Sequence, residues 1–366
     1  MEGLNNLMHK VLVIGGAGYV GKFLIEELII KGYDVYAITR ENGLFLLENY
    51  NVKVLLADNI KGMNMKFDVI INLAYAVGRT FEAKKKNLEI IKIISEAAHE
   101  KSVVIHTSSL AVFGFTLDNE IKAERLDNRS DFVYVESKIH FENELLNTLK
   151  KQIIHIVRLG NVWGPASKNW TVPIINNIIF EKPVGIRGED GYSNVTDVRN
   201  AASYLCYLLN YEPSSRCNFH HLAEFSSLKW SYWISQISNM LNSQPVFIDM
   251  KLRMPNSLMD DLRNSLQYVS PLKIGKYLME GRKSGSYLRN LFSVLPLSIL
   301  NKIDMKVNKS VFDLTDKTVE PVFFAIMTCK KEFRSNIIPG WKPEVSKEKA
   351  VENIYKWAKE AGYLLA

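Results

Sequence analysis

The sequence predicts an α/β fold: a doubly wound parallel sheet covered by helices, followed by a smaller C-terminal α/β lobe. Apolar runs rich in β-branched residues alternate with helical segments through roughly the first 165 residues, which is the pattern of βαβ units in a parallel sheet. A glycine-rich turn at residues 15–21 directly follows the first apolar run. Because ligands bind at the carboxyl ends of parallel strands, this turn marks the expected binding edge.

The expected elements follow from the positions of these apolar runs and helical segments. Four apolar residues, Val11–Ile14, predict the first strand, buried on both faces. After Pro165 the alternation loosens, and it returns near residues 194–224. The other expected strands are Tyr33–Thr39, Val52–Ala57, Val69–Leu73, Val103–Ser109, Ile153–Arg158 and Cys217–Ala223, and the expected helices are Lys22–Ile30, Asn87–Glu100 and Tyr134–Leu149.

The glycine turn predicts an anion site. Glycine lets the backbone approach a pyrophosphate closely, and the free N–H groups of the following helix favour negative charge. The spacing, Gly-x-x-Gly-x-x-Gly, departs from the commoner Gly-x-Gly-x-x-Gly dinucleotide pattern. A turn that serves only tight packing therefore remains the alternative. The residues expected to bind the pyrophosphate are Gly15, Gly18, Tyr19, Val20 and Gly21.

A second group of residues points to proton transfer. Tyr134 and Lys138 lie one helical turn apart, so their side chains share a face. Upstream, the expected strand Val103–Ser109 ends in hydroxyl residues. A phenol has a pKa of about 10, and a neighbouring ammonium lowers that pKa by favouring the phenolate. Phenol, lysine and serine beside a nicotinamide predict hydride transfer between a carbinol and a ketone.

With these motifs in this order, the chain resembles the extended short-chain dehydrogenase/reductase family, which includes nucleotide-sugar epimerases, dehydratases and 4-ketoreductases. Nearly the whole chain takes part, through Asn72-Leu73-Ala74, Ser108 to Gly114, Arg158 to Pro165, Asn194 to Val198 and Gly340 to Pro343. The resemblance implies that Ser109, five residues before Gly114, forms the catalytic trio with Tyr134 and Lys138. It also implies cofactor contacts from Leu73 and Ala74, and adenine contacts from Asp58 and Asn59.

The resemblance implies a division into two lobes as well. Residues 8–165 are expected to form a Rossmann dinucleotide-binding domain, to which the chain returns around 194–224. Residues 166–366 are expected to form mainly a substrate-binding lobe, with an extra helical insertion near 251–328. The insertion contains an apolar stretch at residues 287–300 that is interrupted by Pro296 and flanked by basic residues. A membrane-surface anchor has similar features, but we favour a lid over membrane contact.

The end of the second strand bears on cofactor choice. NAD-selective relatives carry an acidic residue there that binds the ribose hydroxyls, whereas this chain has Thr39 followed by Arg40. A carboxylate would repel a 2′-phosphate, and a guanidinium can bind one with two hydrogen bonds. The pair therefore favours NADP. The alternative is NAD, with Arg40 as a surface cation or stacked on adenine.

The residues after Ser109 narrow the reaction. Related dehydratases carry Asp-Glu there, whereas this chain has Leu110-Ala111, which cannot transfer a proton. We therefore expect an NADP-dependent nucleotide-sugar 4-ketoreductase. The alternatives are an epimerase with retained NAD, a reductase or dehydrogenase of a sterol- or polyketide-like ketone, and a non-catalytic dinucleotide-binding regulator.

Composition sets the remaining expectations. Three scattered cysteines and a start without a basic-then-apolar leader predict a cytoplasmic protein without disulfides. The net charge of +7 forms no basic stripe with interleaved aromatic residues, so we expect no nucleic-acid binding. His220 and His221 are neighbours on one expected strand and so point to opposite faces, and we expect no metal site.

Two of the expected helices predict a homodimer. Family members commonly dimerise through these helices, and here they carry more apolar side chains than one buried face needs. These side chains are Ile90, Ile91, Ile93, Ile94, Phe141, Leu145 and Leu146.

Overall fold

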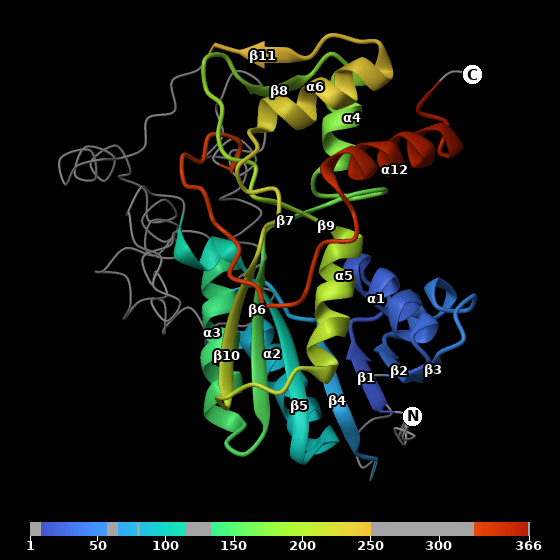
Figure 1. Cartoon of the computed structure of the whole chain (residues 1–366), viewed down its shortest axis with the longest axis vertical. Coiled ribbons are helices and arrows are strands. Elements are labelled where there is room, and N and C mark those ends of the chain that lie inside the picture. The colour runs from blue at the N-terminus through green and yellow to red at the C-terminus, as the bar shows by residue number, and fades with distance from the viewer. Residues whose placement is uncertain (1–8, 57–64, 79–80, 115–132, 250–325, 365–366) are drawn as a thin grey trace, which may run out of the picture.

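A seven-stranded parallel sheet forms the larger lobe of the protein (Figure 1). The computed structural model describes residues 9–56, 65–78, 81–114, 133–249 and 326–364. The strand order is β10-β6-β5-β4-β1-β2-β3, and every neighbouring pair is parallel. The strands are β1 (Lys10–Ile14), β2 (Asp34–Thr39), β3 (Lys53–Leu56), β4 (Phe67–Asn72), β5 (Ala98–Ser109), β6 (Ile153–Leu159) and β10 (Cys217–Leu222).

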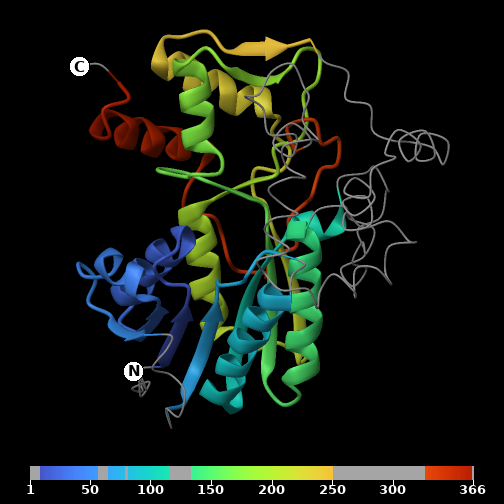
Figure 2. The same cartoon turned by 180° about the vertical axis from the view of Figure 1, so that it is seen from behind.

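Helices cover both faces of this sheet (Figures 1 and 2). Helices α1 (Tyr19–Ile30) and α5 (Val198–Tyr207) pack on one face, and α2 (Phe81–Ala97) and α3 (Val133–Thr148) on the other. The strands are apolar on both faces: in β1, Val11 and Val13 pack towards α1 and α5, whereas Leu12 and Ile14 pack towards α2 and α3. This alternation follows from the two-residue period of a strand.

The smaller lobe lies beyond the carboxyl ends of the strands (Figure 1). Its core contains four buried tryptophans, Trp163, Trp170, Trp230 and Trp233. A two-stranded parallel pair of β7 (Asn161–Trp163) and β9 (Val195–Asp197) lies where the two lobes meet. The other elements are α4 (Thr171–Ile179), β8 (Pro183–Ile186), α6 (Trp230–Leu241), β11 (Val246–Ile248) and α12 (Lys347–Glu360).

Residues 335–346 connect the two lobes. Asn336 pairs antiparallel with His221 at the end of β10. Ile338 and Trp341 are buried in the core of the larger lobe. The chain then reaches Ser346, whose hydroxyl caps α12 in the smaller lobe by accepting a hydrogen bond from the Lys349 N–H at 3.2 Å. One short segment thus contributes to both cores.

The predicted fold class is confirmed, and most element boundaries agree closely, but β5 begins at Ala98 rather than at Val103, and α1 begins at Tyr19 rather than at Lys22. Helix α2 begins at Phe81 rather than at Asn87, so the predicted start was wrong. Residues 81–86 lack apolar periodicity but are mostly good helix formers. Helix α2 also ends at Ala97, because Ala98 already pairs with β4. The expected insertion at 251–328 falls almost wholly outside the described residues, as does its apolar stretch.

Short 3-10 turns follow three of the elements: η1 (Glu41–Leu46), η3 (Leu110–Phe113) and η4 (Leu208–Asn210). Within the described ranges, no helix has the length and apolar character needed to cross a membrane.

Candidate active site

The glycine turn between β1 and α1 leaves no room for side chains. Gly15 has a positive φ of 86°, which other residues rarely adopt. A Cβ atom on Gly21 would lie 2.4 Å from the carbonyl oxygen of Gly16, so only glycine lets α1 start against the turn. Gly18 caps α1 without a side-chain hydrogen bond. The first N–H groups of α1, at Tyr19, Val20 and Gly21, are thus available to an anion.

The end of β4 lies against the glycine turn. The Leu73 N–H donates to the carbonyl oxygen of Ile14 at 2.9 Å, and a Cβ atom on Gly15 would lie 3.1 Å from the Ala74 nitrogen. The Asn72 side chain holds this bend in place, since its Oδ1 accepts from the Ala74 N–H and its Nδ2 donates to the Ala74 carbonyl, both at 3.1 Å. Leu73 and Ala74 therefore line the same edge as the anion site.

The end of β2 lies beside the same turn. The Gly15 N–H donates to the Ile38 carbonyl at 3.3 Å. Thr39 is buried and Arg40 is exposed, so the guanidinium is open to a ligand that the glycine turn holds. Asp58 and Asn59, expected near the adenine, lie outside the described residues.

Ser109 and Tyr134 come together at the end of β5. The Ser109 hydroxyl caps η3 by accepting from the Ala111 N–H at 3.2 Å, and it also hydrogen-bonds with the Tyr134 side chain. The neighbouring Ser108 is buried, and its hydroxyl has no partner among the described residues. Of the two serines, the structure brings Ser109 to Tyr134.

Lys138 lies one turn after Tyr134 on α3 and is only 3% exposed. Its Nζ donates to the carbonyl oxygen of Thr107 at 3.0 Å and lies 3.5 Å from the centre of the Tyr75 ring. Burial lowers the pKa of Lys138 to about 7, and the Glu142 carboxylate opposes this shift. The ammonium is thus directed at Thr107 and Tyr75, whereas the sequence predicted a direct effect on the Tyr134 phenol.

The pKa of Tyr134 reflects its own surroundings. Burial raises it, whereas hydrogen bonds with Ser109 and Tyr75 oppose the increase. The Tyr75 and Tyr134 rings meet edge to face, with centroids 5.7 Å apart. Sequence reasoning missed Tyr75. A large aromatic residue directly after Asn72-Leu73-Ala74, at the predicted binding edge, was the available signal.

A buried ion pair supports α3 from behind the site. Arg158 on β6 donates from Nη2 to Oε2 of Glu142 at 2.7 Å and from Nε to Oε1 at 3.2 Å. Both side chains are 1% exposed. Glu142 is the next residue on the Tyr134 and Lys138 face of α3, four positions after the lysine. The pair therefore connects the helix that carries the site to the central sheet.

Comparisons with known proteins agree with this geometry. A sequence model of the NAD dependent epimerase/dehydratase family matches residues 11–211. The chain belongs to this family.

Several solved structures share the fold of this chain. MoeE5 in complex with UDP-glucuronic acid and NAD is 18% identical, with a TM-score of 0.55 over 68% of this chain and 87% of that one. A UDP-N-acetylglucosamine 4-epimerase from Methanobrevibacter ruminantium, in complex with UDP-N-acetylmuramic acid, is also 18% identical, with a TM-score of 0.52 over 67% of this chain and 86% of the other.

One relative found by sequence is named for a different class of substrate. The sterol-4-alpha-carboxylate 3-dehydrogenase, decarboxylating, of Dictyostelium discoideum is 23% identical over 250 residues, which cover 61% of this chain and 74% of that protein. This chain is accordingly an oxidoreductase or epimerase of the NAD(P)-dependent type.

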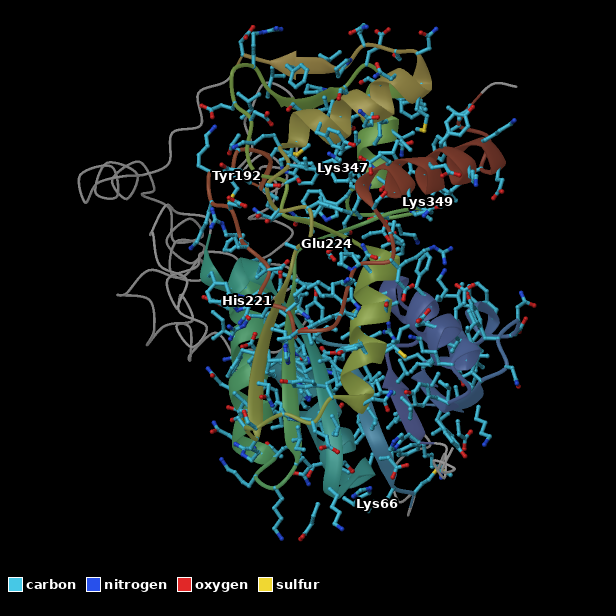
Figure 3. All side chains as sticks on the ribbon, viewed as in Figure 1. Lys66, Tyr192, His221, Glu224, Lys347 and Lys349 are labelled. Atoms are coloured by element: carbon cyan, nitrogen blue, oxygen red, sulfur yellow. The ribbon has the colours of Figure 1, made fainter. Side chains whose placement is uncertain are left out.

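The Tyr19 side chain takes a place that the sequence did not predict. Its hydroxyl donates to the Pro165 carbonyl at 3.0 Å, and burial together with the nearby Asp197 raises its pKa. Burial also raises the pKa of Asp197 to about 6 and that of Glu224 to about 7. Figure 3 shows Glu224 where the two lobes meet. The Tyr19 N–H thus belongs to the anion site, whereas the Tyr19 side chain lies where the two lobes meet.

His220 and His221 face opposite sides of β10 and have different partners. His220 hydrogen-bonds with His155 and with the Tyr204 hydroxyl, each at 2.9 Å, whereas His221 packs edge to face against Phe113 on the other side of β10. Across the described part of the chain, no three His, Cys, Asp or Glu side chains are grouped as metal ligands.

Proposed function

We propose that this protein transfers hydride between a nicotinamide cofactor and a carbinol or ketone carbon, with Tyr134 as the general acid or base. The observation that carries this proposal is the contact of the Tyr134 hydroxyl with Ser109, next to buried Lys138. Ser109 would hold the substrate oxygen, and Tyr134 would exchange a proton with it. Lys138 supplies positive charge at this site.

The residues present fit a dinucleotide. The unfilled N–H groups at the start of α1 would hold the pyrophosphate, and Leu73 and Ala74 would border it. When bound, the nicotinamide supplies or accepts the hydride. The chain's own part is to bind and orient both partners and to move one proton at the Tyr134 oxygen.

We propose a nucleotide-activated sugar as the substrate and reduction of a 4-keto group as the reaction. Structural relatives with nucleotide-sugar ligands support the substrate class. Buried Leu110 and partly buried Ala111 follow Ser109 in η3, and neither can act as an acid or base. A reaction that needs only one proton at the substrate oxygen therefore fits better than dehydration.

A sterol-like ketone is the second candidate substrate. An apolar cluster surrounds Tyr134, with Leu110, Phe113, Val135 and Phe333 among its members, and the Dictyostelium relative is named for a sterol acid. Purified protein should be tested for NADPH and NADH oxidation with 4-keto nucleotide sugars and with 3-keto sterols. Turnover of UDP-hexoses without net cofactor oxidation would instead indicate an epimerase. No turnover of any of these, with cofactor still bound, would favour a regulator.

We also propose NADP as the cofactor, which leads to a prediction about Thr39 and Arg40. A hydrogen bond to a charged group contributes about 1.5–3 kcal/mol, so Arg40 should favour NADP over NAD by about ten- to a hundredfold. The double variant Thr39→Asp with Arg40→Asn should reverse this preference. The new carboxylate can hold ribose hydroxyls but repels the phosphate. Direct titration of both cofactors against both proteins measures the effect.

The partly buried Lys22, on α1, provides a control for the cofactor titration. Lys22→Gln removes a positive charge close to the same turn but not at the end of β2, so it should weaken both cofactors without changing their ratio. Equal affinity of the wild type for NAD and NADP would show that Arg40 is a surface cation. The epimerase would then become the leading interpretation.

We further propose a homodimer in a reducing cytoplasm. The structure buries most of the side chains that suggested the dimer, including Ile91, Ile94, Phe141 and Leu145, within the monomer core. Leu88 and Phe81 on α2 remain 46% and 61% exposed and supply the apolar contact instead. The described cysteines are free, as expected in a reducing compartment.

Light scattering tests the dimer. The wild type should show twice the 41.8 kDa chain mass at micromolar concentration, and Leu88→Glu should reduce it to one chain. Tyr355→Glu changes a similarly exposed residue on α12 in the other lobe and should leave the mass unchanged. A wild-type mass of one chain would contradict the dimer.

A further inference from the structure

Tyr75 contacts both members of the Tyr134 and Lys138 pair. It lies in the bend after β4, where Asn72 and Asn87 fix the backbone on either side. The Asn87 side chain accepts from the Ala76 N–H at 2.6 Å and donates to the Ala76 carbonyl at 2.9 Å. The Asn72 side chain makes the corresponding pair of bonds to Ala74. The backbone on both sides of Tyr75 is therefore held, and its ring has a defined place at the binding edge.

The Tyr75 ring and its hydroxyl have different contacts. The ring face lies 3.5 Å from Nζ of Lys138, a distance at which the π electrons attract an ammonium. The two rings meet edge to face, and the contact of the hydroxyls lowers the pKa of Tyr134 and raises that of Tyr75, as expected when Tyr75 donates to the Tyr134 oxygen. A donor aimed at a phenol oxygen stabilises the phenolate more than the neutral phenol.

We propose that Tyr75 is a positioning residue for the reaction, acting on Tyr134 through its hydroxyl and on Lys138 through its ring. This inference rests on the proposed function. The ring stabilises the buried ammonium and keeps it in place, and the hydroxyl favours the ionised form of the Tyr134 oxygen, which oxidation of a carbinol requires and which remains after Tyr134 protonates a ketone. Tyr75 thus helps to stabilise the Tyr134 phenolate, as a direct contact from the Lys138 ammonium would.

Other titratable groups also face this pair. Lys138 and Glu142 lie on α3 itself, and the Glu142 carboxylate forms an ion pair with Arg158 from β6. His106 on β5 accepts a hydrogen bond at Nδ1 from Nδ2 of Asn72, 3.0 Å away, and burial together with the charge of Lys138 lowers its pKa well below the usual range. His106 is therefore neutral across the working pH range. Among the groups that face the pair, the pH dependence is left to Tyr134 and Lys138.

Two substitutions separate the roles of the ring and the hydroxyl. Tyr75→Phe keeps the ring over Lys138 but removes the donor to Tyr134. The limb of the kcat/KM profile that reports Tyr134 should move to higher pH by about one unit, the change expected when a charge-assisted hydrogen bond is lost. The direction is the same for both reactions: oxidation needs the phenolate and begins at higher pH, whereas reduction needs the phenol and persists to higher pH. The cofactor Kd should not change.

Tyr75→Leu removes the ring as well. The Lys138 ammonium then loses its π contact, so its pKa should fall below that in the wild type and in Tyr75→Phe. Titration of lysine labelled with ¹³C at Cε, followed by NMR and assigned with Lys138→Met, measures this pKa directly. An unchanged Lys138 titration in Tyr75→Leu would overturn the role of the ring.

Tyr36→Phe is the matched control. Tyr36 also has a lysine over its ring, with Lys53 Nζ 4.7 Å from the centroid and 3.1 Å from the hydroxyl, but it lies on β2 away from the site. Its pH profile should match that of the wild type. A wild-type profile in Tyr75→Phe, with Tyr134→Phe inactive, would overturn the inference while leaving the proposed function intact. Full activity of Tyr134→Phe would instead overturn the proposed function.

Discussion

Tyr134→Phe should reduce turnover by about 10²–10⁴-fold, the usual contribution of a general acid or base. The substitution removes only the hydroxyl at the centre of the site, where Ser109 and Tyr75 contact it. Cofactor affinity should remain within a few-fold of wild type, because the phenol ring still fills its place on α3. Steady-state kinetics and a cofactor titration on the same preparation measure both quantities.

Three further variants make the Tyr134 result specific. Lys138→Met should impair both turnover and cofactor binding, since it removes the buried cation beside Tyr134 at the proposed binding edge. Ser108→Ala alters the neighbouring buried serine and should leave turnover near wild type, whereas Ser109→Ala should not. Activity of Tyr134→Phe within tenfold of wild type would rule out Tyr134 as the proton donor.

Glu142→Gln should lower the free energy of unfolding by about 3–5 kcal/mol, because it leaves the Arg158 guanidinium buried without its carboxylate. Both side chains are 1% exposed, so water cannot replace the lost partner. The same change removes the charge that favours the Lys138 ammonium. Urea denaturation of the full chain, followed by circular dichroism, measures the loss of stability.

Removing both charges should be less harmful than removing one. Glu142→Leu with Arg158→Met replaces the pair by apolar side chains, and much of the lost stability should return. Glu82→Gln breaks the exposed pair of Glu82 with Lys86 on α2 and should leave the unfolding midpoint unchanged. Equal midpoints for Glu142→Gln and the wild type would show that the buried pair does not stabilise the fold.

Local sequence patterns predicted the glycine turn and the position of Ser109, Tyr134 and Lys138. The glycine spacing determines how closely α1 can approach the turn, and the four-residue spacing on α3 puts Tyr134 and Lys138 on one face. Both are short-range properties that residue types determine. The order of these motifs along a strand and helix alternation was also sufficient to predict the parallel sheet.

The contacts that tune the site depend on distant segments. Tyr75 meets Tyr134 across 59 positions of chain, and Arg158 meets Glu142 only because β6 lies beside β5 in the folded sheet. No periodicity within a single segment indicates either contact. The start of α2 was missed for a related reason, because its first turn is charged and its helical character comes from propensity rather than from an apolar face.

The segment that joins the lobes also determines when the core of the larger lobe can be completed during synthesis. Ile338 and Trp341 complete a core whose other members, from Val11 to Leu222, emerge from the ribosome much earlier. At about 5–20 residues per second, on the order of ten seconds separate the last strand of the sheet from this segment. During that interval the nascent sheet exposes the apolar surface around Tyr204 that Trp341 later covers. The core of the larger lobe is thus incomplete until residues 338–341 have been synthesised.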